Sequence, residues 1–136
     1  MRRTIVLAGL LACAASGCGP SGPKMVPVSG EVTFNGKPVE TGDILFMPAE
    51  GHAAPEGGRI VNGRYECTCV PGKKRVEVRA TREIPGTSDS MRGGRPRVED
   101  YVPRQFNVDT TLTADVPAAG SNSINFPLTG PGAKVK

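Results

Sequence analysis

The most regular feature of this chain is the alternation of apolar and polar residues between residues 26 and 128. It is clearest in residues 73–82, where Val76, Val78 and Ala80 share one face of the chain and charged residues occupy the other. A period of two is that of a β-strand with one buried face. Similar but shorter patterns predict further strands at residues 26–34, 43–48, 59–61, 64–69, 110–116 and 123–128. The pattern therefore predicts a small β protein of about seven strands.

Turn signals separate these segments. Asn35-Gly36 and Asn62-Gly63 are the residue pairs preferred in tight β-hairpins, because both turn positions need a left-handed backbone. Residues 49–58 have the composition of a loop, and no segment has the spacing of an amphipathic helix. The chain has 18 glycines, 13 prolines and no tryptophan, a composition that favours short strands and many turns. The predicted fold class is all-β, a single antiparallel β-sandwich.

Residues 83–100 interrupt the alternation. They show no periodicity, and a loop of this length in a compact domain is usually functional or disordered. Arginines and an aromatic residue on such a loop suit an anionic glycan, lipid headgroups or an acidic protein surface. In the alternative interpretation, the aromatic side chains pack against the edge of the sandwich and the arginines are solvated. The candidate binding residues are Arg92, Arg95, Arg97, Tyr101 and Arg104.

The N-terminal residues have the form of an export signal. Arg2 and Arg3 precede a short apolar run, and the small residues Ala15-Ser16-Gly17 precede Cys18. The run is shorter than the roughly 20 residues that span a bilayer, so we expect cleavage. The segment resembles bacterial lipoprotein signals, which implies that Cys18 becomes a lipid-modified N-terminus carrying acyl groups such as palmitate. One alternative places the modified residue at Cys13, and another is an exported protein with an unmodified Cys18.

The predicted organisation follows from this signal. Residues 1–17 are the signal peptide, residues 18–25 a flexible linker, residues 26–128 the sandwich and residues 129–136 a disordered tail. The protein is then expected outside the cytoplasm, anchored to the cell membrane or the outer membrane through its lipid. Loss of two arginines with the signal lowers the formal charge from +4 to +2. An exported location argues against a nucleic-acid partner.

Candidate chemistry is sparse. Cys67 and Cys69 share one strand face, but the second pair or histidines of a zinc site are missing. Their Cα atoms are expected roughly 7 Å apart, which disfavours a disulfide in a regular strand. They are interpreted as small core residues, with a redox pair and a metal-ligand pair as alternatives. His52, the only histidine, lies in a loop, and no G-x-S-x-G motif is present. The sequence therefore predicts no catalytic residue, no cofactor and no metal site.

Several motifs together resemble a known family. These are VSGEVTFNGKPVETGDILFMP, GRIVNGRYECTCVPGKKRVEVRATR, YVPRQFN, TLTADV and INFPL. They resemble small bacterial lipoproteins that carry a transthyretin-like domain, also described as carboxypeptidase-regulatory-like. The resemblance covers residues 26–128 and implies a prealbumin-like sandwich anchored outside the cytoplasm. Cys67 and Cys69 depart from it, because such domains usually place aliphatic or polar residues there.

The resemblance implies fold more than activity. Enzymes of the transthyretin fold that hydrolyse 5-hydroxyisourate need clustered histidines and arginines and a Tyr-Arg-Gly-Ser type ending, whereas this chain ends GPGAKVK. The leading hypothesis is a non-catalytic interaction or structural module of the cell envelope, with an envelope protein or an anionic glycan as partner. The alternative is a carbohydrate-binding module for envelope or environmental polysaccharide. A thiol enzyme using Cys67 and Cys69 is a third hypothesis, which thiol titration would separate from the others.

Overall fold

A computed structural model describes residue 19, residues 22–88 and residues 90–131 of the chain. This part is all-β, with nine strands and two single-turn 3-10 helices. It contains no helix with the length and apolar character needed to cross a membrane. The elements are β1 (Val26–Phe34), β2 (Lys37–Pro38), β3 (Thr41–Pro48), β4 (Glu56–Val61), β5 (Arg64–Cys69), β6 (Gly72–Glu83), η1 (Ser90–Arg92), β7 (Val98–Asp100), η2 (Arg104–Phe106), β8 (Thr113–Val116) and β9 (Phe126–Leu128).

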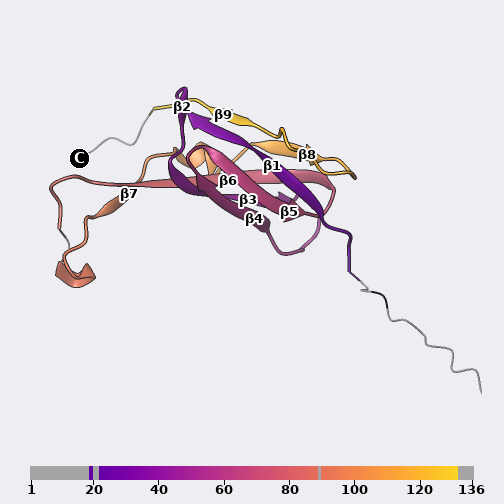
Figure 1. Cartoon of the computed structure of the whole chain (residues 1–136), viewed down its shortest axis with the longest axis horizontal. Helices are drawn as coiled ribbons and strands as arrows, with labels where there is room; N and C mark the ends of the chain where they lie inside the picture. The colour runs from indigo at the N-terminus through magenta and orange to yellow at the C-terminus, as the bar shows by residue number, and fades with distance from the viewer. Residues whose placement is uncertain (1–18, 20–21, 89, 132–136) are drawn as a thin grey trace, which may run out of the picture.

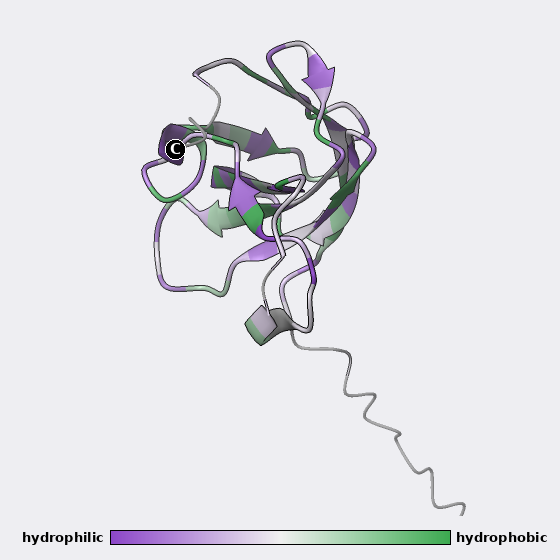
Figure 2. Cartoon of the chain, turned by 90° about the vertical axis from the view of Figure 1, so that its left-hand side faces the viewer, coloured by the Kyte–Doolittle hydropathy of each residue, from purple (hydrophilic) through white to green (hydrophobic). Residues whose placement is uncertain are grey.

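The strands form a sheet that curls around the core into a sandwich-like fold (Figures 1 and 2). The strand order is β2-β1-β5-β4-β3-β6-β7, with β8 paired to β6 and β9 paired to β1. Almost every pairing is antiparallel, as the sequence predicts. The exception is β9, which runs parallel to β1. The segment between β8 and β9 leads from β6 to β1 and already pairs with β1 at Ser121, which bridges to Val28.

The core lies inside the curl and is built mainly of β-branched and aromatic side chains. Alternation in β6 is confirmed, because Val76, Val78 and Ala80 are buried on one face. Phe46, Tyr65 and Phe126 form an aromatic cluster with ring centroids about 6 Å apart. The remaining buried hydrophobic residues are Val26, Val28, Val32, Phe34, Val39, Ile44, Ile60, Cys69, Val102, Val116 and Leu128.

Both predicted Asn-Gly turns are confirmed. Asn35 and Gly36 have φ values of 51° and 79°, and Asn62 and Gly63 have φ values of 50° and 76°. Left-handed residues at both central positions match the twist of the flanking strands. At Gly63 a side chain is also excluded by space, since a Cβ atom would lie 2.6 Å from the Cβ atom of Pro38.

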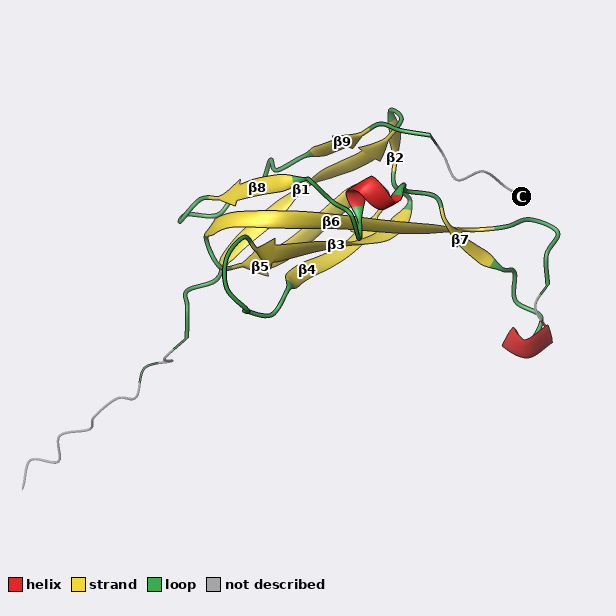
Figure 3. Cartoon of the chain, turned by 180° about the vertical axis from the view of Figure 1, so that it is seen from behind, coloured by secondary structure: helices red, strands yellow, loops and turns green. Residues whose placement is uncertain are grey.

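The strand register defines two ends of the sandwich. At the linker end, β1 begins at Val26, which pairs with Cys69, and β6 begins close by at Gly72. At the opposite end, Gly42 of β3 pairs with Ala80, and β6 continues beyond the core to Glu83. There Thr81–Glu83 pair with β7 and form a projecting hairpin, which we call the arm (residues 81–100). Figures 1 and 3 show the arm and the linker at opposite ends of the molecule.

Two expectations need correction. Residues 83–100 are not a loop throughout, because they contain η1 and β7, and the backbone N–H of Ile84 donates to the Arg97 carbonyl at 2.8 Å. The period of two is hidden because this two-stranded ribbon has no core to cover. The chain after residue 128 is also attached: the Asn35 side chain donates to the Gly130 carbonyl at 2.9 Å and accepts from its N–H at 3.0 Å. Residues 132–136 lie outside the described part.

Candidate functional site

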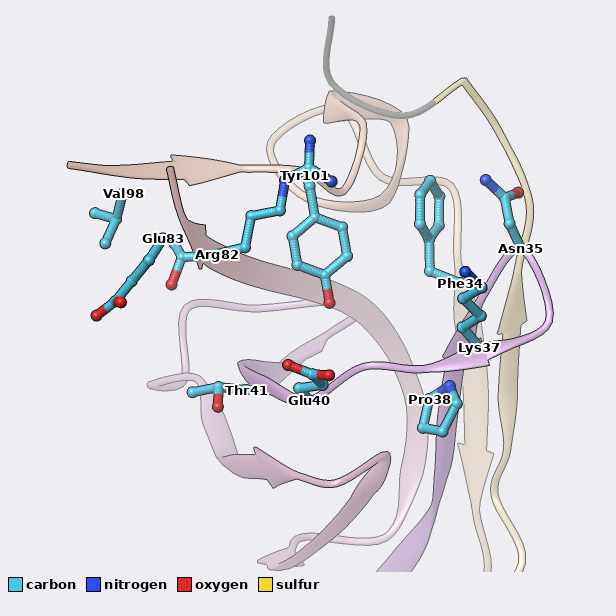
Figure 4. A pocket seen from close by; sticks show the side chains of 11 residues that line it. Phe34, Asn35, Lys37, Pro38, Glu40, Thr41, Arg82, Glu83, Val98 and Tyr101 are labelled. Carbon is cyan, nitrogen blue, oxygen red and sulfur yellow. The ribbon is translucent and has the colours of Figure 1, made fainter. Parts of the chain in front are cut away.

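The arm end contains an open pocket with a volume of about 1030 Å³. Its walls come from the β1–β2 turn on one side and from the base of the arm on the other (Figure 4). The two aromatic residues in its lining are Phe34 and Tyr101. The charged residues in the lining are two basic and two acidic ones, Lys37, Arg82, Glu40 and Glu83. The lining residues are Phe34, Asn35, Lys37, Pro38, Glu40, Thr41, Thr81, Arg82, Glu83, Val98 and Tyr101. We call this the arm-end pocket.

Tyr101 is held in the pocket by contacts on three sides. Its backbone N–H donates to the Ala80 carbonyl at 3.1 Å, which continues the pairing between the arm and β6. Its ring packs against Phe34 with centroids 5.9 Å apart, and the Arg82 guanidinium lies 5.6 Å from the ring centroid. Its hydroxyl points toward Glu40 (Figure 4). The ring is thus half-buried, with one edge facing the open pocket.

The electrostatics of the pocket follow from these contacts. Burial raises the pKa of the Tyr101 hydroxyl, and the nearby charge of Glu40 raises it further. Arg82 and a hydrogen bond with the Glu40 backbone act in the opposite direction. Arg82 itself donates to Glu99 at 2.7 Å, and 49% of its side chain remains exposed. The pocket therefore presents a neutral phenol beside a cation that is still accessible to a ligand.

The structure separates the five predicted binding residues. Tyr101 lies in the arm-end pocket, whereas Arg95 and Arg97 are exposed farther along the arm. Arg104 lies in η2 and forms an ion pair with Asp109 at 3.1 Å. Arg92 belongs to η1, but its side chain is outside the described part. Phe106 and Val102, near Tyr101 in sequence, pack against the core as the alternative interpretation expects.

Sequence reasoning missed the residues that surround Tyr101. Phe34 and Glu40 reach it through the turn between β1 and β3, a contact that a local pattern does not reveal. A signal for Arg82 was present, however. Arg82 is the next residue after Ala80 on the core-facing side of β6, two residues further along the strand. A charged residue in the core-facing register marks the place where a strand leaves the core.

The linker end holds a second group of polar side chains. Cys67 and Cys69 lie on the core-facing side of β5 with their Sγ atoms 3.7 Å apart, and both are free thiols. Cys69 is fully buried, whereas Cys67 is partly exposed. Beside them the ammonium of Lys74 donates to Glu56 at 2.9 Å, and Glu56 also accepts from the Val70 N–H at 3.1 Å. Only 4% of the Lys74 side chain is exposed, so this ion pair is largely sealed from water.

Both thiols favour the protonated form in this environment. Burial raises the pKa of Cys69 from 9.0 to about 12, with further increases from Cys67 and Glu56, while Lys74 acts in the opposite direction. Burial also raises the pKa of Cys67. A protonated thiol is a poor nucleophile, so the pair lacks the activated thiolate that cysteine catalysis needs. His52, the other candidate for thiol chemistry, is exposed in the loop between β3 and β4.

Within the described residues, no three His, Cys, Asp or Glu side chains are grouped closely enough to hold a metal ion together. Comparisons of the chain with protein-family models, with curated proteins and with solved structures found no match. The all-β, sandwich-like fold is thus given by the structure, and the likeness to transthyretin-like lipoproteins rests on the sequence motifs.

Proposed function

We propose that this protein is a lipid-anchored, non-catalytic interaction module of the bacterial cell envelope, outside the cytoplasm. The observation that carries the proposal is the placement of the linker and the arm at opposite ends of the sandwich (Figure 1). A lipid on Cys18 would hold the linker end near the membrane. The arm and the arm-end pocket would then face away from the membrane toward other envelope components.

The length of β6 sets the distance between the linker end and the arm. Its 12 residues begin near the linker and end in the arm. At about 3.3 Å per residue, the stretch of β6 from Gly72 to Thr81 places the base of the arm roughly 30 Å away from the linker end. The arm projects farther still and displays Arg95 and Arg97. An upright domain would therefore present these arginines to a partner beyond the lipid headgroups.

An anionic glycan or an acidic surface of an envelope protein fits the arm. The guanidinium groups of Arg95 and Arg97 are exposed, and arginine forms paired hydrogen bonds with carboxylates. Arg82 adds a half-exposed cation at the base of the arm. We therefore take an acidic polymer as the preferred partner class.

A carbohydrate-binding module for envelope or environmental polysaccharide is the second candidate, and the arm-end pocket favours it. The aromatic pair Phe34 and Tyr101 lies next to Lys37, Glu40 and Thr41. Aromatic faces pack on sugar rings, and charged or hydroxyl side chains bind sugar hydroxyls. The balanced charge of the pocket suits a neutral sugar better than an acidic one.

Lipid anchoring is tested by comparing Cys18→Ala with Cys13→Ala in a bacterial host supplied with an alkyne analogue of palmitate. We expect Cys18→Ala to lose the label and leave the membrane fraction, while Cys13→Ala keeps both. The reverse result would place the modification at Cys13. Absence of label from the unsubstituted protein would contradict the anchor altogether.

The partner class is tested by affinity electrophoresis in gels containing polygalacturonate or dextran. We expect Arg95→Gln/Arg97→Gln to abolish retardation by polygalacturonate. The control Arg59→Gln/Lys73→Gln removes the same charge from two exposed positions on β4 and β6 and should have much less effect. Retardation by dextran that is lost in Lys37→Gln/Glu40→Gln would favour the carbohydrate-binding module instead. Equal effects of the arm variant and its control would show that the arm contributes only non-specific charge to binding.

A further inference from the structure

The Cys67–Cys69 pair has a geometry that neither a packed core nor catalysis requires. The two Sγ atoms lie 3.7 Å apart on one face of β5, and Cys67 is partly exposed while Cys69 is fully buried. Cys67 is thus partly accessible, and the buried Cys69 lies two residues further along the same strand face. We propose that Cys67 and Cys69 form a binding site for a single Cu(I) ion at the linker end of the sandwich.

A bridging ion fits this pair better than a disulfide does. A disulfide requires sulfur atoms about 2.05 Å apart and Cα atoms usually within 6.8 Å. Residues two apart in an extended strand are separated by about 6.6 Å or more, near the upper limit of that range. β5 also pairs with β1 along all six of its residues, which opposes the local distortion that closure would need. An ion between the thiols leaves the sulfur atoms apart and the strand pairing intact.

The donor set selects the ion. Two thiolates are soft ligands, which favour Cu(I), zinc and iron–sulfur centres over hard cations. Structural zinc takes four protein ligands, and iron–sulfur clusters take several cysteines, whereas Cu(I) is satisfied by two sulfur donors. The pair supplies two. Cu(I) is therefore the metal whose coordination number matches the site.

The surrounding groups act on the bound form in both directions, and burial of the thiols opposes their ionisation. Binding replaces two S–H protons by one metal ion: Cu⁺ + 2 R–SH → [Cu(SR)₂]⁻ + 2 H⁺, with no change of oxidation state. The charged groups that face the thiols are Glu56 and Lys74, and Tyr65 lies beside them in the neutral form. Lys74 offsets part of the charge gained at Cys69, and Glu56 opposes it. Affinity should therefore rise with pH as proton release becomes easier.

Access to the site is provided at Cys67. Its neighbour across the β4–β5 ribbon is Gly58, where even a methyl group would approach the Cys67 Cβ atom to 3.2 Å. Glycine at this position leaves the space beside Cys67 free of a side chain, and Cys67 itself is partly exposed. A metal ion carried by a small chelator can therefore reach the outer thiol first and engage Cys69 by a side-chain rotation.

The test uses the full chain with Cys13→Ser/Cys18→Ser, in which Cys67 and Cys69 are the two remaining cysteines. The reduced protein is titrated under argon with the Cu(I)–bicinchoninate complex, and transfer of copper is followed by loss of the complex's colour. We expect one copper per chain, two protons released per copper in weakly buffered solution, and an X-ray absorption spectrum with sulfur ligands alone. Further replacement of Cys67 or Cys69 by Ser should abolish transfer, while circular dichroism shows that the near-isosteric variants remain folded.

Three results would overturn the proposal. The first is copper uptake that survives in the variant lacking all four cysteines. The second is preferential binding of Zn²⁺ in a parallel titration with a zinc indicator. The third is failure to take copper from the bicinchoninate complex while maleimide labelling shows that both thiols are reduced and, after unfolding, reactive. None of these readouts depends on lipid anchoring or on the arm.

Discussion

The two ends of the sandwich differ in how they expose a cation of β6. The core-facing register of β6 carries a cation at each end, Lys74 at the linker end and Arg82 at the arm end. Lys74 is 4% exposed and bonded to Glu56, which is itself mostly buried. Arg82 is 49% exposed, bonded to Glu99 and lying over the ring of Tyr101. One cation is enclosed by the fold, and the other remains open to a ligand.

This difference shows that burial decides whether a charged side chain only stabilises the fold or can also bind a ligand. A charge removed from water must keep its partner, because separation leaves an uncompensated ion in a medium of low polarity. Lys74 is therefore committed to Glu56. Arg82 keeps contact with water and can exchange a partner at little cost. The arm end thus keeps an accessible cation and the linker end does not, although each end has an ion pair of similar length.

The largest expected effect separates these two cations. We predict that Lys74→Met lowers the free energy of unfolding by about 3 kcal/mol, because it leaves the Glu56 carboxylate buried with the Val70 N–H as its remaining partner. The matched change Arg82→Met should cost about 1 kcal/mol, since it removes an exposed ion pair and one cation–π contact. Urea unfolding at neutral pH measures both.

A double variant sharpens this prediction. Replacing both members of the buried pair, Lys74→Met with Glu56→Leu, removes the stranded charge and should recover part of the stability lost in Lys74→Met. The Val70 N–H then loses its acceptor, so recovery should be incomplete. Equal losses for Lys74→Met and Arg82→Met would contradict the contrast between the two ends.

The second prediction concerns alkaline pH at the linker end. The pKa of Cys69 is raised to about 12 in the folded protein, whereas the unfolded thiol ionises near 9.0. The protonated form is thus favoured by folding, and its contribution to stability is complete below pH 9. Stability should fall as pH rises from 9 toward 12, with a slope of at most about 1.4 kcal/mol per pH unit for this thiol.

Urea unfolding at several pH values, with a reductant present, measures this slope. Cys69→Ala should make the decline shallower, although Cys67 and the two tyrosines continue to contribute because their pKa values are also raised. An unchanged slope in Cys69→Ala would show that this thiol is not shielded. Rapid reaction of both native thiols with a thiol reagent would lead to the same conclusion.

Sequence reasoning succeeded where the pattern is local and failed where it is not. The period of two in β6 and the Asn-Gly turns depend on neighbouring residues, so strand and turn could be predicted together. The parallel pairing of β9 with β1 depends on residues more than 90 positions apart, and no local pattern records it. The arm has no buried face, so its strands carry no alternation.

The candidate site was predicted in part for the same reason. Tyr101 was identified because an aromatic residue stands among arginines in the sequence. Its neighbours Phe34 and Glu40 come from a distant turn and could not be found. The cysteines show the converse case, because strand periodicity correctly places Cys67 and Cys69 on one face, while their unequal exposure depends on the residues packed around them.

The third prediction compares the two tyrosines. The Tyr65 hydroxyl lies in the core and donates to the Ile124 carbonyl at 2.7 Å, so Tyr65→Phe should cost about 1 kcal/mol. The Tyr101 hydroxyl borders the open pocket, where water can replace a lost partner, and Tyr101→Phe should cost less than about 0.5 kcal/mol. Thermal and urea unfolding of the two variants measure the difference. A larger loss for Tyr101→Phe would mean that the arm-end pocket is a closed part of the core.

The smallest effect on stability is expected from the arm. Ile84 and Arg97 form the last described backbone–backbone hydrogen bond that joins the two sides of the arm, so residues 85–96 can be replaced by Asn-Gly to close a two-residue hairpin. The pairs from Thr81 to Glu83 with Val98 to Asp100 are kept, and Tyr101 stays attached to Ala80. We expect the free energy of unfolding to change by less than about 0.5 kcal/mol, because the deleted residues lie outside the core. The same variant should lose its retardation by polygalacturonate, since Arg95 is removed and Arg97 moves into the turn. A marked loss of stability would instead show that the arm supports the fold. Its charges would then be structural, like the buried ion pair at the linker end.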